Sequence, residues 1–121
     1  MIRENINKWD VGNVFPLVEI GGDIVKQDDR YLVKDNNLLN NLIVSSTRLN
    51  ANKSTSGHTH PGQEEVYMFL EGSGMMELDE RHFSFNEGDM VLVEDGVFHR
   101  VHAGVKGCYF VCVFDGKRSH Q

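Results

Sequence analysis

The stretch GHTHPGQEEVYMFL, residues 57–70, decides how this chain folds. It places His58 and His60 two residues apart and then, after a turn, places Glu65 at the start of an apolar run. Side chains alternate between faces along a strand, so both histidines are expected to point the same way. Glu65 can face the same cavity from the next strand, and His99 begins another strand-like run. Three imidazoles and one carboxylate form a complete ligand set for a transition metal.

The rest of the chain has the pattern of a β protein, because almost no segment shows helical periodicity. Short apolar runs are separated by turns rich in Gly, Asn and Asp, including Gly72-Ser73-Gly74 and Glu94-Asp95-Gly96. Many short strands joined by such turns predict a sandwich or a barrel. The strands are expected at residues 14–18, 23–25, 31–33, 41–49, 58–60, 65–71, 74–79, 90–94, 97–103 and 107–115.

The composition is that of one globular domain of 121 residues, with 40% hydrophobic and 25% charged residues. A net charge of -6 supplies no basic face, which argues against nucleic acid as a partner. The N-terminus lacks the apolar core of a signal peptide, and no apolar run reaches membrane-spanning length. Cys108 and Cys112 would lie roughly 13 Å apart in a strand, too far for a disulfide, so a reduced cytoplasmic protein is expected.

Residues 52 to 103 resemble the two motifs of the cupin superfamily. The first motif, G-x5-H-x-H-x(3,4)-E-x6-G, corresponds here to the segment from Asn52 to Gly72. The second motif, G-x5-P-x-G-x2-H-x3-N, corresponds to the segment from Gly88 to Ala103. This chain departs from the motifs at three positions, none of which is a ligand position: Asn52 replaces a glycine, Glu94 a proline and Ala103 an asparagine. Asn52 is a mild change, because asparagine also tolerates positive φ in a turn.

The resemblance implies a single-domain jelly-roll barrel of six to eight strands, with a metal near one mouth. Residues 1–40 would supply N-terminal strands or a strap, residues 41–115 the barrel with both motifs, and residues 116–121 a tail. Small cupins commonly pair sheet to sheet, so a homodimer is expected, with Met68 and Leu70 on the outer face as its candidate surface. The positions that hold metal in the family are all present here: His58, His60, Glu65 and His99.

Several neighbours of these positions have competing interpretations. Glu64 is an alternative carboxylate, but the six-residue gap to Gly72 selects Glu65, and strand register then turns Glu64 outward. His102 falls on the face opposite His99 and is expected at the surface. Tyr67 shares the face of Glu65, where its hydroxyl is a candidate proton donor.

Two questions about the cavity wall stay open at this point. In the last apolar run, either the set of Cys108, Phe110, Cys112 and Phe114 or the alternating set of Tyr109, Val111 and Val113 lines the cavity. Arg48 reaches the cavity only if the face that carries Val44 and Ser46 points inward.

The ligand set suits one divalent transition metal, Fe, Mn, Zn, Co or Ni, and does not choose among them. The resemblance implies a small-molecule enzyme of the isomerase, dioxygenase or lyase type, with Glu65 or Tyr67 moving a proton. The alternative is a non-catalytic module that binds a metal or a sugar. Arg48, Lys53, Arg100 and Lys106 are the basic residues near the site in sequence, which makes a weak case for a phosphorylated substrate. A small anionic or hydroxylated molecule is therefore the expected ligand.

Overall fold

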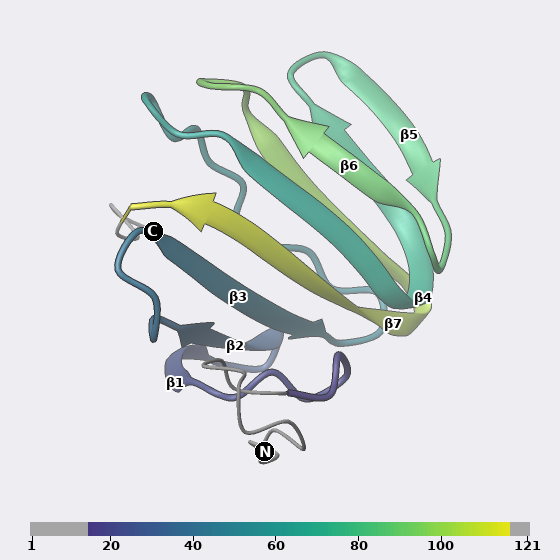
Figure 1. Ribbon diagram of the computed structural model, residues 1–121. Coiled ribbons are helices and arrows are strands. Elements are labelled where there is room, and N and C mark those ends of the chain that lie inside the picture. Colours follow the sequence, from purple (N-terminus) through teal and green to yellow (C-terminus); the bar gives the residue numbers. More distant parts are fainter. Residues whose placement is uncertain (1–14, 117–121) are drawn as a thin grey trace.

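The computed structural model describes residues 15–116, which form β-strands and no helix (Figure 1). Accordingly, this part of the chain holds no helical segment that could cross a membrane. The strands are β1 (Asp23–Gln27), β2 (Tyr31–Asn36), β3 (Leu42–Leu49), β4 (Glu65–Leu78), β5 (Arg81–Phe85), β6 (Met90–Val93) and β7 (His99–Asp115).

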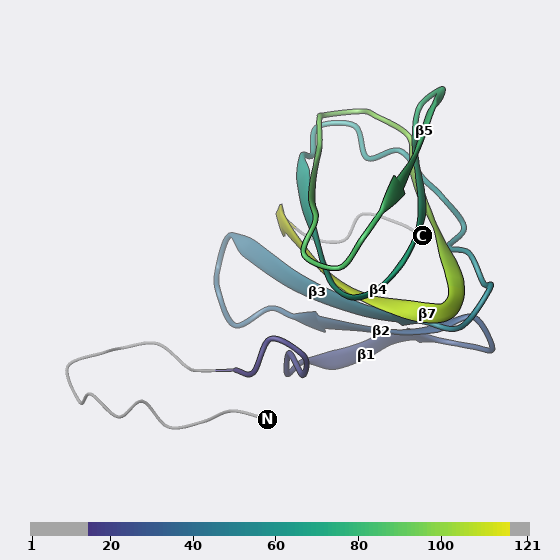
Figure 2. The same ribbon diagram turned by 90° about the vertical axis from the view of Figure 1, so that its right-hand side faces the viewer.

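All strand pairs are antiparallel, and the strands follow the order β1-β2-β3-β7-β4-β5, with β6 paired to the first part of β4. The sheet curls because β4 and β7 are long and bent. The second half of β7 pairs with β3 and with the first half of β4, and its first half pairs with the second half of β4, which also carries β5. Figure 2 shows β7 turning the corner between the layer of β1, β2 and β3 and the strands above it. The result is the expected all-β jelly-roll barrel.

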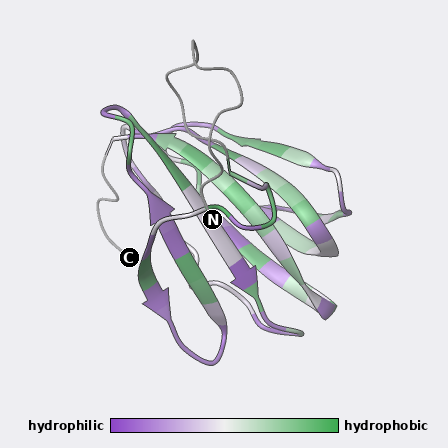
Figure 3. Cartoon of the chain, turned by 60° about the horizontal axis from the view of Figure 1, so that its bottom comes forward, coloured by the Kyte–Doolittle hydropathy of each residue, from purple (hydrophilic) through white to green (hydrophobic). Residues whose placement is uncertain are grey.

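The interior follows the two-residue period of the strands. In β4, Glu65, Tyr67 and Phe69 are buried, whereas the residues between them are half-buried. Phe69 is fully buried and its ring stacks on Phe85 of β5, with the ring centroids 3.7 Å apart. Figure 3 shows this alternation of hydrophobic and hydrophilic residues along the strands, with mostly hydrophilic loops between them. One apolar core therefore fills the barrel and leaves polar side chains at its mouth.

The strand boundaries differ from the prediction at the glycines. Gly72-Ser73-Gly74 is no turn: β4 continues through it, with shifts of register against β7 between Phe69 and Glu71 and between Gly72 and Gly74. Gly72 has a φ of +80°, and a Cβ there would lie 2.2 Å from the carbonyl oxygen of Gly107. These glycines are therefore bulges that bend a continuous strand. Likewise, the two predicted strands at 97–103 and 107–115 are one strand, β7, which begins at His99 and runs to Asp115.

Two further expectations about strands are wrong, and one strand was not predicted. Residues 58–60 form no strand, since His58 makes only one isolated bridge, to His99. Residues 81–85 form β5, which the polar composition of the segment concealed. Residues 15–18 lie in a turn, and residue 14 falls outside the described residues. Both cysteines are buried and neither forms a disulfide, and burial raises the pKa of the Cys108 thiol to about 12.

The outer face of β4 and β7 is partly covered by the same chain. Met68 and Leu70 pack against a cluster of Ile20, Tyr109 and Val111. Ile20 comes from the segment before β1, which crosses this face. Part of the surface expected to pair with a second subunit is thus used within the chain, and the homodimer stays a prediction.

Candidate metal centre

Three histidines from separate parts of the chain meet inside one mouth of the barrel. His58 and His60 come from the loop before β4, and His99 is the first residue of β7. One nitrogen from each ring lies within 4.8 Å of the others, and the ring centroids are 4.8 to 5.4 Å apart. His60 and His99 are buried and His58 is half-buried. The arrangement offers three imidazole donors around one point, which could hold a metal ion.

His58 is held in place by a loop that pairs with β7 without forming a strand. The backbones of His58 and His99 exchange two hydrogen bonds of 3.1 and 3.0 Å. Earlier in the loop, the N–H of Thr55 donates to the carbonyl of Val101 and its hydroxyl accepts from the N–H of Val101. Asn52 turns the loop with a φ of +61°, the conformation expected at this glycine position of the motif. The histidine pair therefore owes its direction to contacts with β7.

The tautomer of His99 follows from its neighbour. Nδ1 of His99 lies 3.0 Å from the carbonyl oxygen of Val97, which can only accept a hydrogen bond. In the neutral ring the proton is therefore on Nδ1, and the lone pair of Nε2 points into the site. Nε2 is buried and makes no hydrogen bond to any described residue. A buried acceptor without a hydrogen bond is costly, and coordination to a metal is the chemistry that would satisfy it.

Glu65 lies against the same two buried rings. Its Oε1 is 3.2 Å from Nε2 of His99 and 3.4 Å from Nε2 of His60, and the residue is 7% exposed. Glu64, the competing carboxylate, is exposed. A carboxylate oxygen and a nitrogen lone pair repel each other at this distance unless a proton or a cation lies between them. The donor set and its burial thus fit a divalent cation.

The electrostatics of the site keep an imidazole ready to bind. The pKa of His58 is lowered to about 4, mainly by burial and further by the neighbouring His99 and His60. At pH 7 this ring is neutral, so a metal does not have to displace a proton from it.

The structure decides the open questions about the cavity wall. Phe110, Cys112 and Phe114 of β7 line the cavity, together with Tyr67 of β4. The ring of Tyr67 stacks on Phe110 at 5.3 Å between centroids and meets His99 edge-on at 5.7 Å. The cavity is about 40 Å³. One water needs roughly 10–15 Å³ on this measure, so the space beside the histidines suits a ligand of few atoms.

The basic residues considered in the sequence lie elsewhere. Ser45 and Thr47 face the cavity, so Arg48 points outward, where it pairs with Glu71 at 3.1 Å and stacks over Tyr109. Arg100 Nε donates to the carbonyl of Thr55, Lys53 pairs with Asp29 at 3.5 Å, and Lys106 is exposed: none of these side chains lines the cavity.

His102 faces away from the metal centre, as expected, but it is not simply at the surface. Its Nε2 lies 2.6 Å from Oε1 of Glu77 and its Nδ1 lies 2.6 Å from the hydroxyl of Ser54. Its side chain is 24% exposed. These contacts add to the pairing of the loop with β7, so His102 helps to hold the segment that leads to His58.

Sequence reasoning missed Lys26 of β1, which reaches the wall of the cavity near His58. It also missed Gln63, which lines the cavity and donates from its side-chain amide to the carbonyl of Asp115 at 2.9 Å. Spacing from the Glu65 position could have indicated Gln63. No signal in the sequence indicated Lys26, because its strand lies far from the motifs and has no clear alternation.

Comparison with known proteins bears on the fold and on the family. A family model described as a cupin domain matches residues 46–114, and no curated protein sequence matches. KdgF from Halomonas sp. has a TM-score of 0.71 at 14% identity, covering 80% of this chain and 88% of that one. DMSP lyase DddQ from Ruegeria pomeroyi DSS-3 has a TM-score of 0.67 at 18% identity, covering 77% and 50%. A predicted oxalate decarboxylase from Thermotoga maritima has a TM-score of 0.61 at 22% identity, covering 69% and 80%.

The matched segment covers more than half of the 121 residues and contains all three histidines of the cluster. The structural matches agree in fold over most of the described chain. Sequence motif, barrel and histidine cluster therefore lead to the same conclusion: the chain belongs to the cupin family.

Proposed function

We propose that this cupin is a metal-dependent enzyme that acts on a small polar molecule. In this proposal His58, His60, His99 and Glu65 hold one divalent transition metal. The observation that carries it is the buried Nε2 of His99, which is deprotonated in the neutral ring, has no hydrogen bond to residues 15–116 and lies 3.2 Å from Oε1 of Glu65. A divalent ion bound there would polarise an oxygen of the ligand.

The reaction proposed is a proton transfer of the isomerase or lyase type. Tyr67 is buried in the wall of the cavity, close to His99, and carries the hydroxyl that would donate or accept a proton. Its ring is fixed between His99 and Phe110, so the hydroxyl is oriented before a ligand arrives. Two of the similar folds are described as a lyase and as a predicted decarboxylase, which is compatible with this chemistry. A dioxygenase is the alternative if the metal is iron.

Metal content is the first test. The protein is purified without chelator or nickel and measured by mass spectrometry beside the double variant His58→Ala, His99→Ala. About one equivalent in the parent and none in the variant is the expected result. Iron would direct the next assay to oxygen consumption, and manganese, cobalt or zinc to isomerase and lyase screens. A parent that binds no metal after reconstitution would refute the proposal.

Tyr67→Phe tests the chemistry separately from the metal. The variant keeps the ring and its contacts but lacks the hydroxyl, so metal content is expected to stay at the parent value. For a turnover identified in those screens, kcat is expected to fall about 100-fold or more, the usual contribution of a positioned acid or base. An unchanged kcat in the metal-loaded variant would remove Tyr67 from the mechanism.

A further inference from the structure

We infer that Lys26 binds a carboxylate of the substrate, and that the substrate is a small carboxylate anion with a second oxygen that reaches the metal. This inference rests on the proposed metal site and adds the class of molecule that the site takes.

Lys26 is the one lysine or arginine among the described residues that line the metal cavity. It comes from β1, the edge strand of the sheet, where the other four residues are exposed and Lys26 alone is half-buried. The half-buried lysine thus lines the same cavity as His58. The position is specific, because surface lysines of an edge strand ordinarily point to solvent.

A β-bulge turns this side chain inward. Ile24 pairs with Lys34, whereas Lys26 pairs with Val33, so β1 has one more residue than β2 between these pairs. An unbroken register would have placed Val25 opposite Val33 and Lys26 opposite Leu32. Val33 is buried and lines the cavity, whereas Leu32 faces the outer groove. The extra residue therefore exchanges a valine for a lysine in the wall of the cavity.

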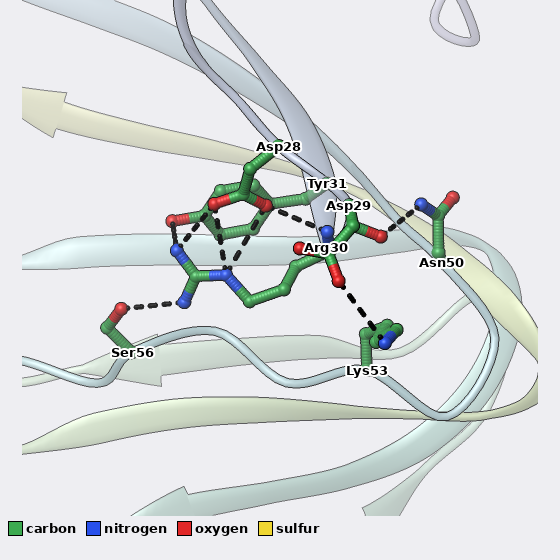
Figure 4. A network of polar contacts seen from close by, with 7 residues as sticks. All are labelled: Asp28, Asp29, Arg30, Tyr31, Asn50, Lys53 and Ser56. Atoms are coloured by element: carbon green, nitrogen blue, oxygen red, sulfur yellow. Dashed lines mark hydrogen bonds and ion pairs between the residues drawn. The ribbon is translucent and has the colours of Figure 1, made fainter.

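The hairpin that carries Lys26 is fixed to the metal-binding loop (Figure 4). Arg30, in the turn between β1 and β2, donates from Nη1 to the hydroxyl of Ser56 at 2.8 Å and from Nη2 to the hydroxyl of Tyr31 at 3.0 Å. Asn50 donates to the carbonyl of Asp29 in the same turn at 2.9 Å. Ser56 lies two residues before His58. The network sets the distance between the hairpin and the histidine cluster before a ligand binds.

The charges in the cavity favour an anion. Lys26 lines the same cavity as His58, His60 and Glu65. A divalent ion with Glu65 would carry one net positive charge, and Lys26 adds a second. In a chain whose net charge is -6, this concave site is locally positive. A carboxylate with a second oxygen offers one anionic group to Lys26 and one oxygen to the metal, whereas a neutral sugar offers no anionic group to either.

The test uses malonate as the anionic probe and malonamide as its neutral analogue. The metal-loaded parent, Lys26→Met and Lys26→Arg are titrated with each probe by calorimetry, after circular dichroism and metal analysis show that fold and loading are intact. Lys34→Met is the matched control, because Lys34 lies on the neighbouring strand and lines the outer groove. Lys26→Met is expected to weaken malonate binding about tenfold or more, as for loss of a charged hydrogen bond. Lys26→Arg keeps the positive charge and is expected to keep the malonate affinity of the parent.

Malonamide binding, and malonate binding by Lys34→Met, should change less than about twofold, as for surface positions that make no contact with the ligand. The inference is overturned if Lys26→Met binds malonate as the parent does, if it weakens both probes equally, or if the metal-loaded parent does not bind malonate. Each of these results leaves the proposed metal site standing. A parent that binds no metal overturns the proposed function, and this inference with it.

Discussion

Replacing His99 by leucine should separate the metal-binding role of this residue from its role in the fold. In the metal-free protein the imidazole is 2% exposed, and its Nε2 is buried without a hydrogen bond. Such a group costs about 1–3 kcal/mol, which leucine, with a similar volume, does not incur. Leucine loses the hydrogen bond from Nδ1 to Val97, worth about 0.5–1.5 kcal/mol. In the metal-free state, the free energy of unfolding of the variant should therefore equal that of the parent or exceed it by about 1 kcal/mol.

Adding a metal should make the parent more stable than the His99→Leu variant. At a metal concentration one hundred times Kd, binding stabilises the parent by about 2.7 kcal/mol. For a domain of this size that is a rise in Tm of roughly 10 °C. Leucine cannot coordinate a metal, so the Tm of His99→Leu should be the same with metal as in chelator.

The assay is thermal unfolding at pH 8 in chelator and again with zinc or manganese. Val101→Ala is the control, because Val101 shares the buried face of His99 on β7 and carries no polar atom. It should lose about 2–3 kcal/mol in both conditions and keep the shift with metal. If His99→Leu is destabilised in chelator as much as Val101→Ala, or shifts with metal as the parent does, the reasoning is wrong.

Three other predictions follow from single features. The pKa of His58 is about 4 in the folded chain and near 6.5 unfolded, so the unfolded state takes up the proton first and the metal-free protein loses stability as pH falls from 6.5 to 4. In urea unfolding at pH 8, 6 and 5, the free energy of unfolding should depend less on pH in His58→Asn than in the parent. An equal pH dependence in the two proteins would contradict this role of His58. Gly74→Ala places a methyl 2.1 Å from the carbonyl of His102 and should cost about 3 kcal/mol, against under about 0.5 for the exposed Ser73→Ala. Light scattering should find the expected homodimer, and a monomer at micromolar concentration would contradict it.

The sequence was sufficient to identify site residues whose residue type and spacing are themselves distinctive. His58, His60 and His99 are identifiable because few residue types bind metals and their spacing matches a motif. Glu65 and Tyr67 share a face because strand period is a local property that any short apolar run reveals. Asn52 shows the same reasoning at the level of the backbone, since its φ of +61° is the value that its motif position requires.

The sequence was insufficient where the backbone departs from regular structure. Gly72 and Gly74 are typical of a turn, and only the approach of the carbonyls of Gly107 and His102 shows that they are bulges in one strand. A strand was expected at His58, but the structure has a loop there. Backbone hydrogen bonds to β7, made with residues about forty positions away in the sequence, hold this loop in place. Such contacts depend on the whole sheet, and no local pattern encodes them.

Lys26 shows why this difference matters for function. The proposed metal ligands would determine which chemistry the site can perform, and motif spacing in the sequence reveals them. The residue that would select the substrate lies on an edge strand, and its direction depends on a single extra residue in β1. A one-residue change of register turns every side chain that follows it to the other face. Relatives with the same four ligands could therefore accept differently charged molecules through insertions in β1, and substrate class in such small barrels should be sought at this edge strand as well as in the metal motif.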